Sequence, residues 1–314
     1  MNSVLKSMFF IFIVPGICLV AIIALLIFTD KERIFSSIPK DYNSLIKTQE
    51  TIEQQYLNYG SYKINNSGIS KKFKSDEKYK NVLENLYYPK SLLTSTTTND
   101  FPIIILVTNA FFDTDIKLIC EHIVSWGFVV LTVKDKNPSS YSITKLHEYL
   151  DDLNEKESIN FSENEFKQKF NVNNIGIIGF DEALDAIYNT IKYSNINDKI
   201  KTIISLSPKF SEDSNIKELK IDIPSMVMIP SNNTDFTIRD QRKLSNTIVG
   251  EKVIARRKNA DYQDMIYIST GYVVAWLRYI FYSKKDKTEN DFFSELEKNE
   301  LYKNCDIYIK DRNY

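Results

Sequence analysis

Five short runs of mainly apolar residues recur in the middle of the chain. They occupy residues 102–108, 128–133, 175–179, 202–207 and 225–229. The apolar residues are continuous rather than alternating, which is typical of strands that are buried on both faces of a parallel sheet. The pattern therefore predicts five central strands.

Stretches with helical periodicity separate these runs. In the first of them, an apolar face is formed by Ile116, Ile119, Cys120, Ile123 and Val124, and Gly127 follows as a helix stop. Comparable helices are predicted at residues 143–153, 182–193, 236–248 and 268–281. The alternation of strands and helices predicts one α/β domain with a doubly wound, mostly parallel sheet.

Residues 8–28 are 21 consecutive residues without a charge. As a helix they would span ~31 Å, which matches the hydrocarbon thickness of a bilayer. We predict a single-pass membrane helix. The alternative is a cleaved signal peptide, whose apolar region is usually shorter, about 7–15 residues, and ends in small residues. The predicted organisation is an anchor at residues 1–28, a polar stalk at 29–56 and a globular domain at 57–314.

Composition narrows the class of protein. The chain has 314 residues with 40 Lys and Arg against 41 Asp and Glu, so its formal net charge is -1. A dedicated nucleic-acid partner is therefore not expected, because such proteins carry a basic excess. Hydrophobic residues make up 43% of the chain, which is enough to form a substantial core.

Five segments together resemble a known family. One is the expected strand, turn and helix at residues 175–185, and the others are residues 86–89, 125–133, 224–229 and 272–277. In order and spacing they resemble the bacterial cutinase and polyester-hydrolase branch of the α/β-hydrolase superfamily, which is similar to dienelactone hydrolases. Residues 175–185 lie where that family has its nucleophile elbow, G-x-S-x-G. The resemblance implies a sheet of α/β-hydrolase type over about residues 59–305, and the secreted habit of the family implies an extracytoplasmic domain.

The resemblance also implies that the catalytic triad is lost. It places Asp181 at the serine position and Asp261 at the histidine position. The acid position falls at Thr234 or, with a one-residue shift, at Asp235. No histidine follows His147, so a histidine base cannot occupy its usual place. We interpret His122 and His147 as surface residues of helices.

The oxyanion loop is altered as well. Both of its glycines are missing from residues 108–114, Phe111 stands at the first amide donor, and Glu182 stands at the position after the nucleophile. We therefore expect a binding or scaffold module without an organic cofactor, whose partner is a protein or a small apolar ligand. The alternative is an ester hydrolase that uses a carboxylate or a metal-assisted site. Asp181 has two interpretations. It is either a catalytic carboxylate of that alternative hydrolase or a cap of the helix that follows it.

A further hypothesis places a cation among Asp181, Asp235 and Asp261. Three neighbouring carboxylates repel one another unless a proton or a cation intervenes, and such an oxygen-rich site suits Ca²⁺ or Mg²⁺. The hypothesis predicts that saturating Ca²⁺ or Mg²⁺ raises the melting temperature of the full chain. At a cation concentration a hundred times Kd, binding adds about 2.7 kcal/mol to the free energy of unfolding. An unchanged melting temperature in both series would exclude the cation.

Overall fold

The computed structural model describes residues 38–68, 85–95, 101–108, 113–133, 139–155, 166–181, 183–209, 220–232, 236–282 and 289–308. All of them belong to a compact unit that extends from Ser37 to Tyr314. The predicted anchor at residues 8–28 lies outside the described residues. Among the described helices, none combines the length and the apolar character that a membrane crossing requires.

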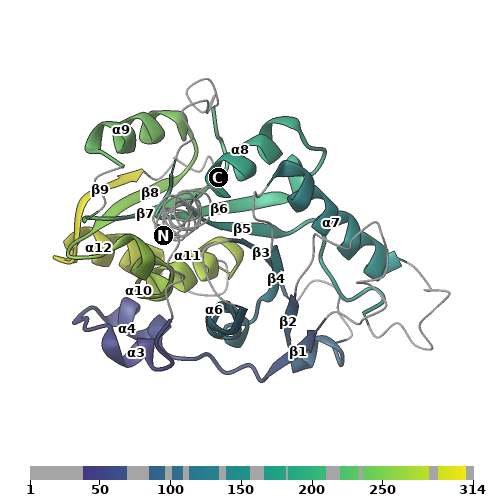
Figure 1. Cartoon of the computed structure of the whole chain (residues 1–314). Coiled ribbons are helices and arrows are strands. Elements are labelled where there is room, and N and C mark those ends of the chain that lie inside the picture. The colour runs from purple at the N-terminus through teal and green to yellow at the C-terminus, as the bar shows by residue number, and fades with distance from the viewer. Residues whose placement is uncertain are drawn as a thin grey trace, which may run out of the picture. The chain divides into compact units, whose positions relative to one another are not determined.

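A nine-stranded sheet runs through the described part of this unit, in the order β1-β2-β4-β3-β5-β6-β7-β8-β9 (Figure 1). The strands are β1 (Ile64–Gly68), β2 (Asn85–Pro89), β3 (Ile103–Val107), β4 (Val129–Val133), β5 (Ile175–Phe180), β6 (Ile200–Leu206), β7 (Ser225–Pro230), β8 (Lys252–Arg257) and β9 (Tyr302–Tyr308). The six strands from β4 to β8 in this order are parallel, and β1, β2 and β9 pair antiparallel. The predicted α/β class with a mostly parallel sheet is confirmed.

Helices cover both faces of the sheet (Figure 1). On one face lie α3 (Tyr42–Leu45), α4 (Thr51–Leu57), α6 (Asp113–Ser125), α10 (Met265–Ile268), α11 (Thr270–Tyr282) and α12 (Glu289–Lys298). On the other face lie α7 (Ser140–Glu155), α8 (Ala183–Tyr193) and α9 (Ile238–Thr247). The sheet is therefore doubly wound, as its apolar runs predict.

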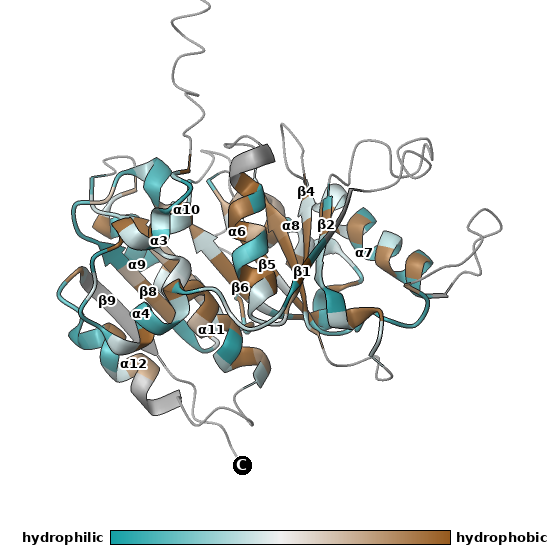
Figure 2. Cartoon of the chain, turned by 90° about the horizontal axis from the view of Figure 1, so that it is seen from below, coloured by the Kyte–Doolittle hydropathy of each residue, from teal (hydrophilic) through white to brown (hydrophobic). Residues whose placement is uncertain are grey.

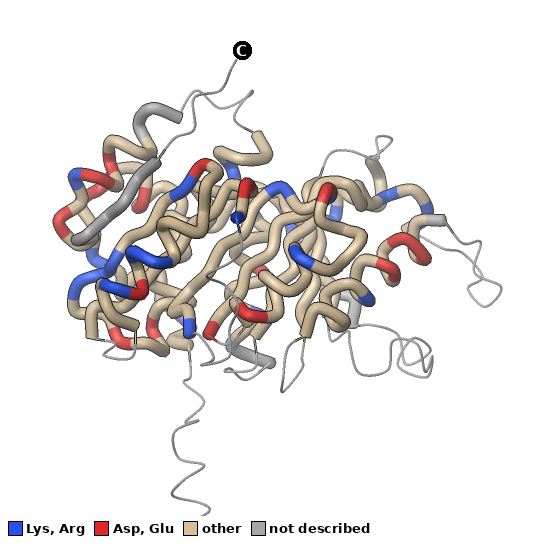
Figure 3. Tube along the Cα trace, turned by 90° about the horizontal axis from the view of Figure 1, so that it is seen from above, with Lys and Arg blue, Asp and Glu red and all other residues tan. Residues whose placement is uncertain are grey.

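The central strands explain why both faces must be covered. All five residues of β3 are buried, with Ile104 and Leu106 in the core under α6 and α11, and Ile103, Ile105 and Val107 in the core under α7 and α8. Figure 2 shows β5 and β6 largely in the brown of hydrophobic residues, and Figure 3 shows long tan stretches of the trace in the middle of the described unit. The two cores follow directly from the period of two along a strand.

The five predicted strands and the five predicted helices are present, with ends shifted by a few residues. The other four strands of the sheet, β1, β2, β8 and β9, are not among the five predicted ones. In β8, Lys252, Arg256 and Arg257 interrupt the apolar run, yet five of its six residues are buried. The Arg256 guanidinium donates to the carbonyl oxygens of Pro230 at 3.3 Å and Phe236 at 3.0 Å, which makes its burial tolerable.

Residues 38–57, called the strap below, differ from the predicted stalk. Tyr42, Ile52 and Tyr56 are buried in the same core as α6 and α11. The strap therefore belongs to the folded unit, and the described part of the predicted stalk is a layer of the domain rather than a polar spacer.

A buried ion pair fastens the strap to the sheet. Glu53 of α4 is fully buried, and its Oε1 accepts a hydrogen bond from Arg257 Nη1 at 3.0 Å. Its Oε2 accepts from Asn299 Nδ2 at 3.2 Å, and the Arg257 guanidinium lies 4.8 Å from the centre of the Tyr302 ring. These contacts join the N-terminal strap to strands β8 and β9, more than 200 residues away in the sequence.

The first turn of α4 has a second acidic partner from α12. The Glu295 carboxylate accepts from the backbone N–H groups of Ile52, at 2.8 and 2.9 Å, and Glu53, at 3.0 Å. It replaces the capping side chain that α4 itself does not supply. The negative charge also suits the positive end of the helix.

We predict that Glu53→Ala lowers the free energy of unfolding by about 3–5 kcal/mol, because it leaves Arg257 buried without its counter-ion. Urea unfolding of the full chain, followed by circular dichroism, measures the change. Gln55→Ala on the exposed side of the same helix is the matched control and should change stability by less than about 0.5 kcal/mol. Equal effects of the two substitutions would contradict a stabilising role for the pair.

Candidate functional site

The carboxyl ends of the parallel strands meet at one edge of the sheet, where open α/β sheets bind their ligands. Asp181 directly follows β5, Ser207 directly follows β6, and Asp261 lies in the segment after β8. This edge contains the two described residues of the predicted triad positions. Asp235, Thr234, Glu182 and Phe111 lie outside the described residues.

Asp181 occupies a strained turn between β5 and α8. Its φ is +61°, in the left-handed region that Asp tolerates better than most residues. Its backbone N–H donates to the Leu206 carbonyl at 3.1 Å, and its own carbonyl accepts from the N–H groups of Lys209 at 3.3 Å and Leu184 at 3.5 Å. The turn is therefore held from both the neighbouring strand and the following helix.

Small residues let α8 approach this turn closely. A Cβ atom added to Gly179 would lie 2.4 Å from Ile187 Cδ1 and 3.3 Å from the Cβ of Ala183. The sequence Gly179, Phe180, Asp181 thus combines a close strand-to-helix contact with a positive φ two residues later. A sharp, strained turn of this kind is the geometry that presents a nucleophile in α/β-hydrolases.

The turn that carries Asp261 is tied to the ends of three other strands. The Asp261 carboxylate is exposed and accepts from Asn232 Nδ2, after β7, at 2.8 Å. The next residue, Tyr262, packs edge-on against Phe180 with ring centres 5.1 Å apart, and its carbonyl accepts from Ser207 Oγ at 2.9 Å. The structure thus brings the Asp181 turn and the Asp261 turn to the same part of the edge.

The prediction that both histidines lie on helix surfaces is wrong. His122 is completely buried and His147 is 2% exposed. His122 lies in the last turn of α6, which runs back toward the amino ends of the strands. His147 contacts Val172, just before β5, and Lys199, just before β6.

His122 holds the strap against α6. Its Nδ1 lies 2.5 Å from the Tyr42 hydroxyl, and its Nε2 lies 2.8 Å from the Tyr56 carbonyl oxygen and 3.1 Å from that of Asn58. These partners fit a neutral ring in which Nε2 donates and Nδ1 accepts. Burial lowers the pKa of His122 to about 4, against the opposing effect of the two carbonyls.

His147 is part of a second, partly buried polar cluster. Its Nδ1 lies 3.0 Å from a carboxylate oxygen of Asp151, and its Nε2 lies 3.1 Å from Lys199 Nζ and from the Val172 carbonyl oxygen. Burial lowers the pKa of His147, and Asp151 opposes the shift. The cluster lies at the amino edge of the sheet, separated from Asp181 by the length of β5, about 20 Å.

The proposed cation site is described only in part. Among the described residues, no group of three or more His, Cys, Asp or Glu side chains is arranged to hold a metal ion. Asp181 and Asp261 lie at one edge, but the third member, Asp235, lies outside this part of the chain. The cation therefore stays a hypothesis.

Sequence reasoning did not identify Glu53 and Arg257 as partners. The available signal was weak: Glu53 lies at helical spacing from the buried Tyr56 and Leu57, and Arg257 ends a strand whose inner residues are apolar. Neither pattern indicates that the two side chains meet.

Comparison of the chain with models of known protein families and with curated proteins finds no match.

We predict that His122 makes stability depend on pH between about 4 and 6.5. The folded state holds this histidine neutral with a pKa of about 4, whereas the unfolded chain binds a proton near pH 6.5. The contribution is complete above pH 6.5 and is lost as the pH falls to about 4, a change of about 3 kcal/mol. Urea unfolding at several pH values should show this extra loss of stability relative to His122→Gln, which retains all carboxylates and therefore their share of the pH dependence. If the free energy of unfolding changes with pH in parallel for the two proteins, the prediction is contradicted.

Proposed function

We propose that this protein is a membrane-anchored binding module with an α/β-hydrolase-like domain that has no esterase activity. The strained turn at Asp181 supports the hydrolase-like assignment, because it lies between a parallel strand and a helix, at the carboxyl edge. The packing of Gly179 against α8 supports it as well. The residue at the apex of the turn is a carboxylate rather than a serine.

We infer the loss of activity from the positions of the two histidines. The chain has only two, and both are engaged in buried hydrogen bonds toward the amino ends of the strands. Acyl transfer in a hydrolase of this kind needs a base within hydrogen-bond reach of the nucleophile. Neither His122 nor His147 meets that condition for Asp181.

A nucleophilic Asp181 would not restore turnover. Attack by its carboxylate forms a covalent ester with the substrate, and water must then hydrolyse that ester. Because this site has no histidine base, no imidazole activates the water, and the covalent ester would not be turned over. The carboxyl edge is therefore proposed to bind a small apolar ligand or a protein partner without cleaving it.

The location of the protein is part of the same proposal. Residues 8–28 insert in the membrane as a single span, and the domain faces the extracytoplasmic side. The length of the uncharged segment supports the span. The secreted habit of the resembling family supports the side.

Hydrolysis of p-nitrophenyl butyrate by the full chain in a neutral detergent tests the proposal. We expect the rate to equal that of buffer and detergent alone, and Asp181→Asn to give the same rate. Asn is the matched variant because it tolerates a positive φ and keeps the size of the side chain. Turnover that disappears in Asp181→Asn would overturn the proposal, and turnover that disappears with EDTA would favour the metal-assisted alternative.

A further inference from the structure

The outer side of α9 carries a row of cations. The inner side of the helix is buried at Gln241 and Leu244. The outer side exposes Arg239, Arg242 and Lys243. Because the second and third of these follow the first by three and four positions, their side chains lie on one side of the helix. Figure 1 shows α9 at the outside of the described unit, beyond β8.

Two of these cations are not balanced by a nearby carboxylate. Lys243 Nζ lies 3.0 Å from a carboxylate oxygen of Asp240, so these two charges offset each other. Within the described part of the chain, Arg239 and Arg242 form no ion pair. The outer side of α9 therefore has an excess of two positive charges, and both are guanidinium groups.

The chain beside the C-terminal end of α9 does not cancel this excess. Ile221 forms a parallel bridge with Ile248, which directly follows the helix. The residues on either side of Ile221 are Lys220 and Asp222, and both are exposed. They contribute one charge of each sign, so the net charge of this surface stays positive.

Two exposed aliphatic side chains flank the cations. Ile238, the first residue of α9, is 50% exposed, and Val249, two residues beyond its end, is 39% exposed. Among the residues that the structure describes, Leu45 is the other large aliphatic residue of this kind. Exposed apolar surface is unfavourable in water, so its position beside the arginines favours a partner that offers both negative charge and an apolar layer.

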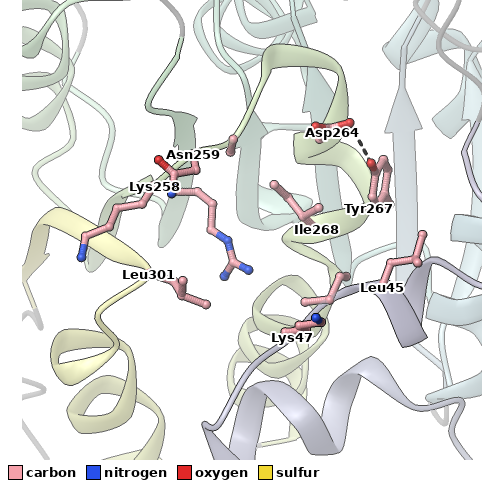
Figure 4. A pocket seen from close by; sticks show the side chains of 11 residues that line it. Leu45, Lys47, Lys258, Asn259, Asp264, Tyr267, Ile268 and Leu301 are labelled. Atoms are coloured by element: carbon pink, nitrogen blue, oxygen red, sulfur yellow. Dashed lines mark hydrogen bonds between the residues drawn. The ribbon is translucent and has the colours of Figure 1, made fainter.

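The cations of the pocket beside the strap are not gathered in this way. The pocket lies between the strap and the segment that follows β8, and its lining includes Lys47, Arg257 and Lys258. Figure 4 shows the Lys258 side chain extending away from Lys47. Arg257 is paired with Glu53. A shared direction of unpaired cations is therefore a property of α9 rather than of this pocket.

We propose that the outer side of α9 docks on the anionic lipid surface of the membrane that holds the anchor. The guanidinium groups of Arg239 and Arg242 bind lipid phosphates, and the side chains of Ile238 and Val249 enter the headgroup layer. A lipid surface fits better than a soluble polyanion, because the lipid supplies an apolar layer next to its charge. The inference rests on the proposed membrane anchor and is independent of the Asp181 turn.

A fluorescent label tests the docking in the full chain reconstituted in vesicles. Ile238→Cys carries the environment-sensitive dye NBD, and Cys18→Ser and Cys305→Ser leave the buried Cys120 as the one other thiol. Phosphatidylcholine vesicles are compared with vesicles that also contain phosphatidylglycerol. We expect the NBD emission to rise with phosphatidylglycerol alone, and the rise to disappear in about 1 M salt, where the Debye length is about 3 Å.

Arg239→Gln and Arg242→Gln should each lower the ratio of docked to undocked chains about fivefold, which corresponds to ~1 kcal/mol for one cation at an anionic surface. The ratio is measured at the salt concentration where half of the labelled chains are docked. Lys298→Gln is the matched control, because it removes an exposed cation from α12, on the other face of the sheet. Its ratio should equal that of the labelled chain without this substitution.

The outcomes separate docking from anchoring. Flotation of the full chain with phosphatidylcholine vesicles in high salt tests the anchor alone, and failure to float there would contradict the anchor, whatever the label shows. Docking is overturned if phosphatidylglycerol does not raise the emission, or if Arg239→Gln and Arg242→Gln behave like Lys298→Gln. An equal rise with soluble polyglutamate would replace the lipid surface with an acidic partner and overturn the proposal as well.

Discussion

Burial of the central strands on both faces is the constraint on which the rest of the structure depends. Strands β3, β4 and β5 have no exposed residue, so helices must cover each side, and Thr132 is the only polar side chain of these three strands. Chemistry is confined to the strand ends and to the segments that connect them. This is why the Asp181 turn and the Asp261 turn both lie at carboxyl ends of strands.

The buried polar groups of the helical layers and of β8 have a different role. Glu53, Arg257, His122 and His147 each have specific partners, and each joins segments that are distant in the sequence. A buried charge or imidazole is costly unless it is satisfied, so these contacts select one arrangement of the strap and helices over others. The two histidines therefore act as structural links, although their residue type alone would suggest catalysis.

The sequence predicts the centre of the fold well because continuous apolar runs have one physical explanation. Strand β8 was missed because its three cations conceal the pattern, and their partners, such as Pro230 and Glu53, are far away in the sequence. The burial of His122 was missed for the same reason, since Tyr42 and Tyr56 lie 80 and 66 residues before it. The strap did contain a signal, because Ile38, Tyr42 and Ile46 recur every four residues, but its polar composition favoured a stalk.

The role of the candidate site stays a prediction, but the local structure at its centre agrees with the sequence. The resemblance places a strand, a turn and a helix at residues 175–185, and the structure has β5, the Asp181 turn and α8 there. The bonds that link Asp261 to Asn232 and Tyr262 to Ser207 join different strands. Contacts between strands depend on topology and leave no local pattern.

The attachment of the strap also determines how the domain would respond to mechanical force. A pull applied at Ile38 would load α3 and α4 before any strand of the sheet, since the strap is the first described segment of the unit. The load would then pass through His122 into α6 and through Glu53 into β8 and α12, along two separate routes. Peeling of the strap would be the first mechanical event, and the hydrogen-bonded sheet behind it would remain intact while the tension was relieved.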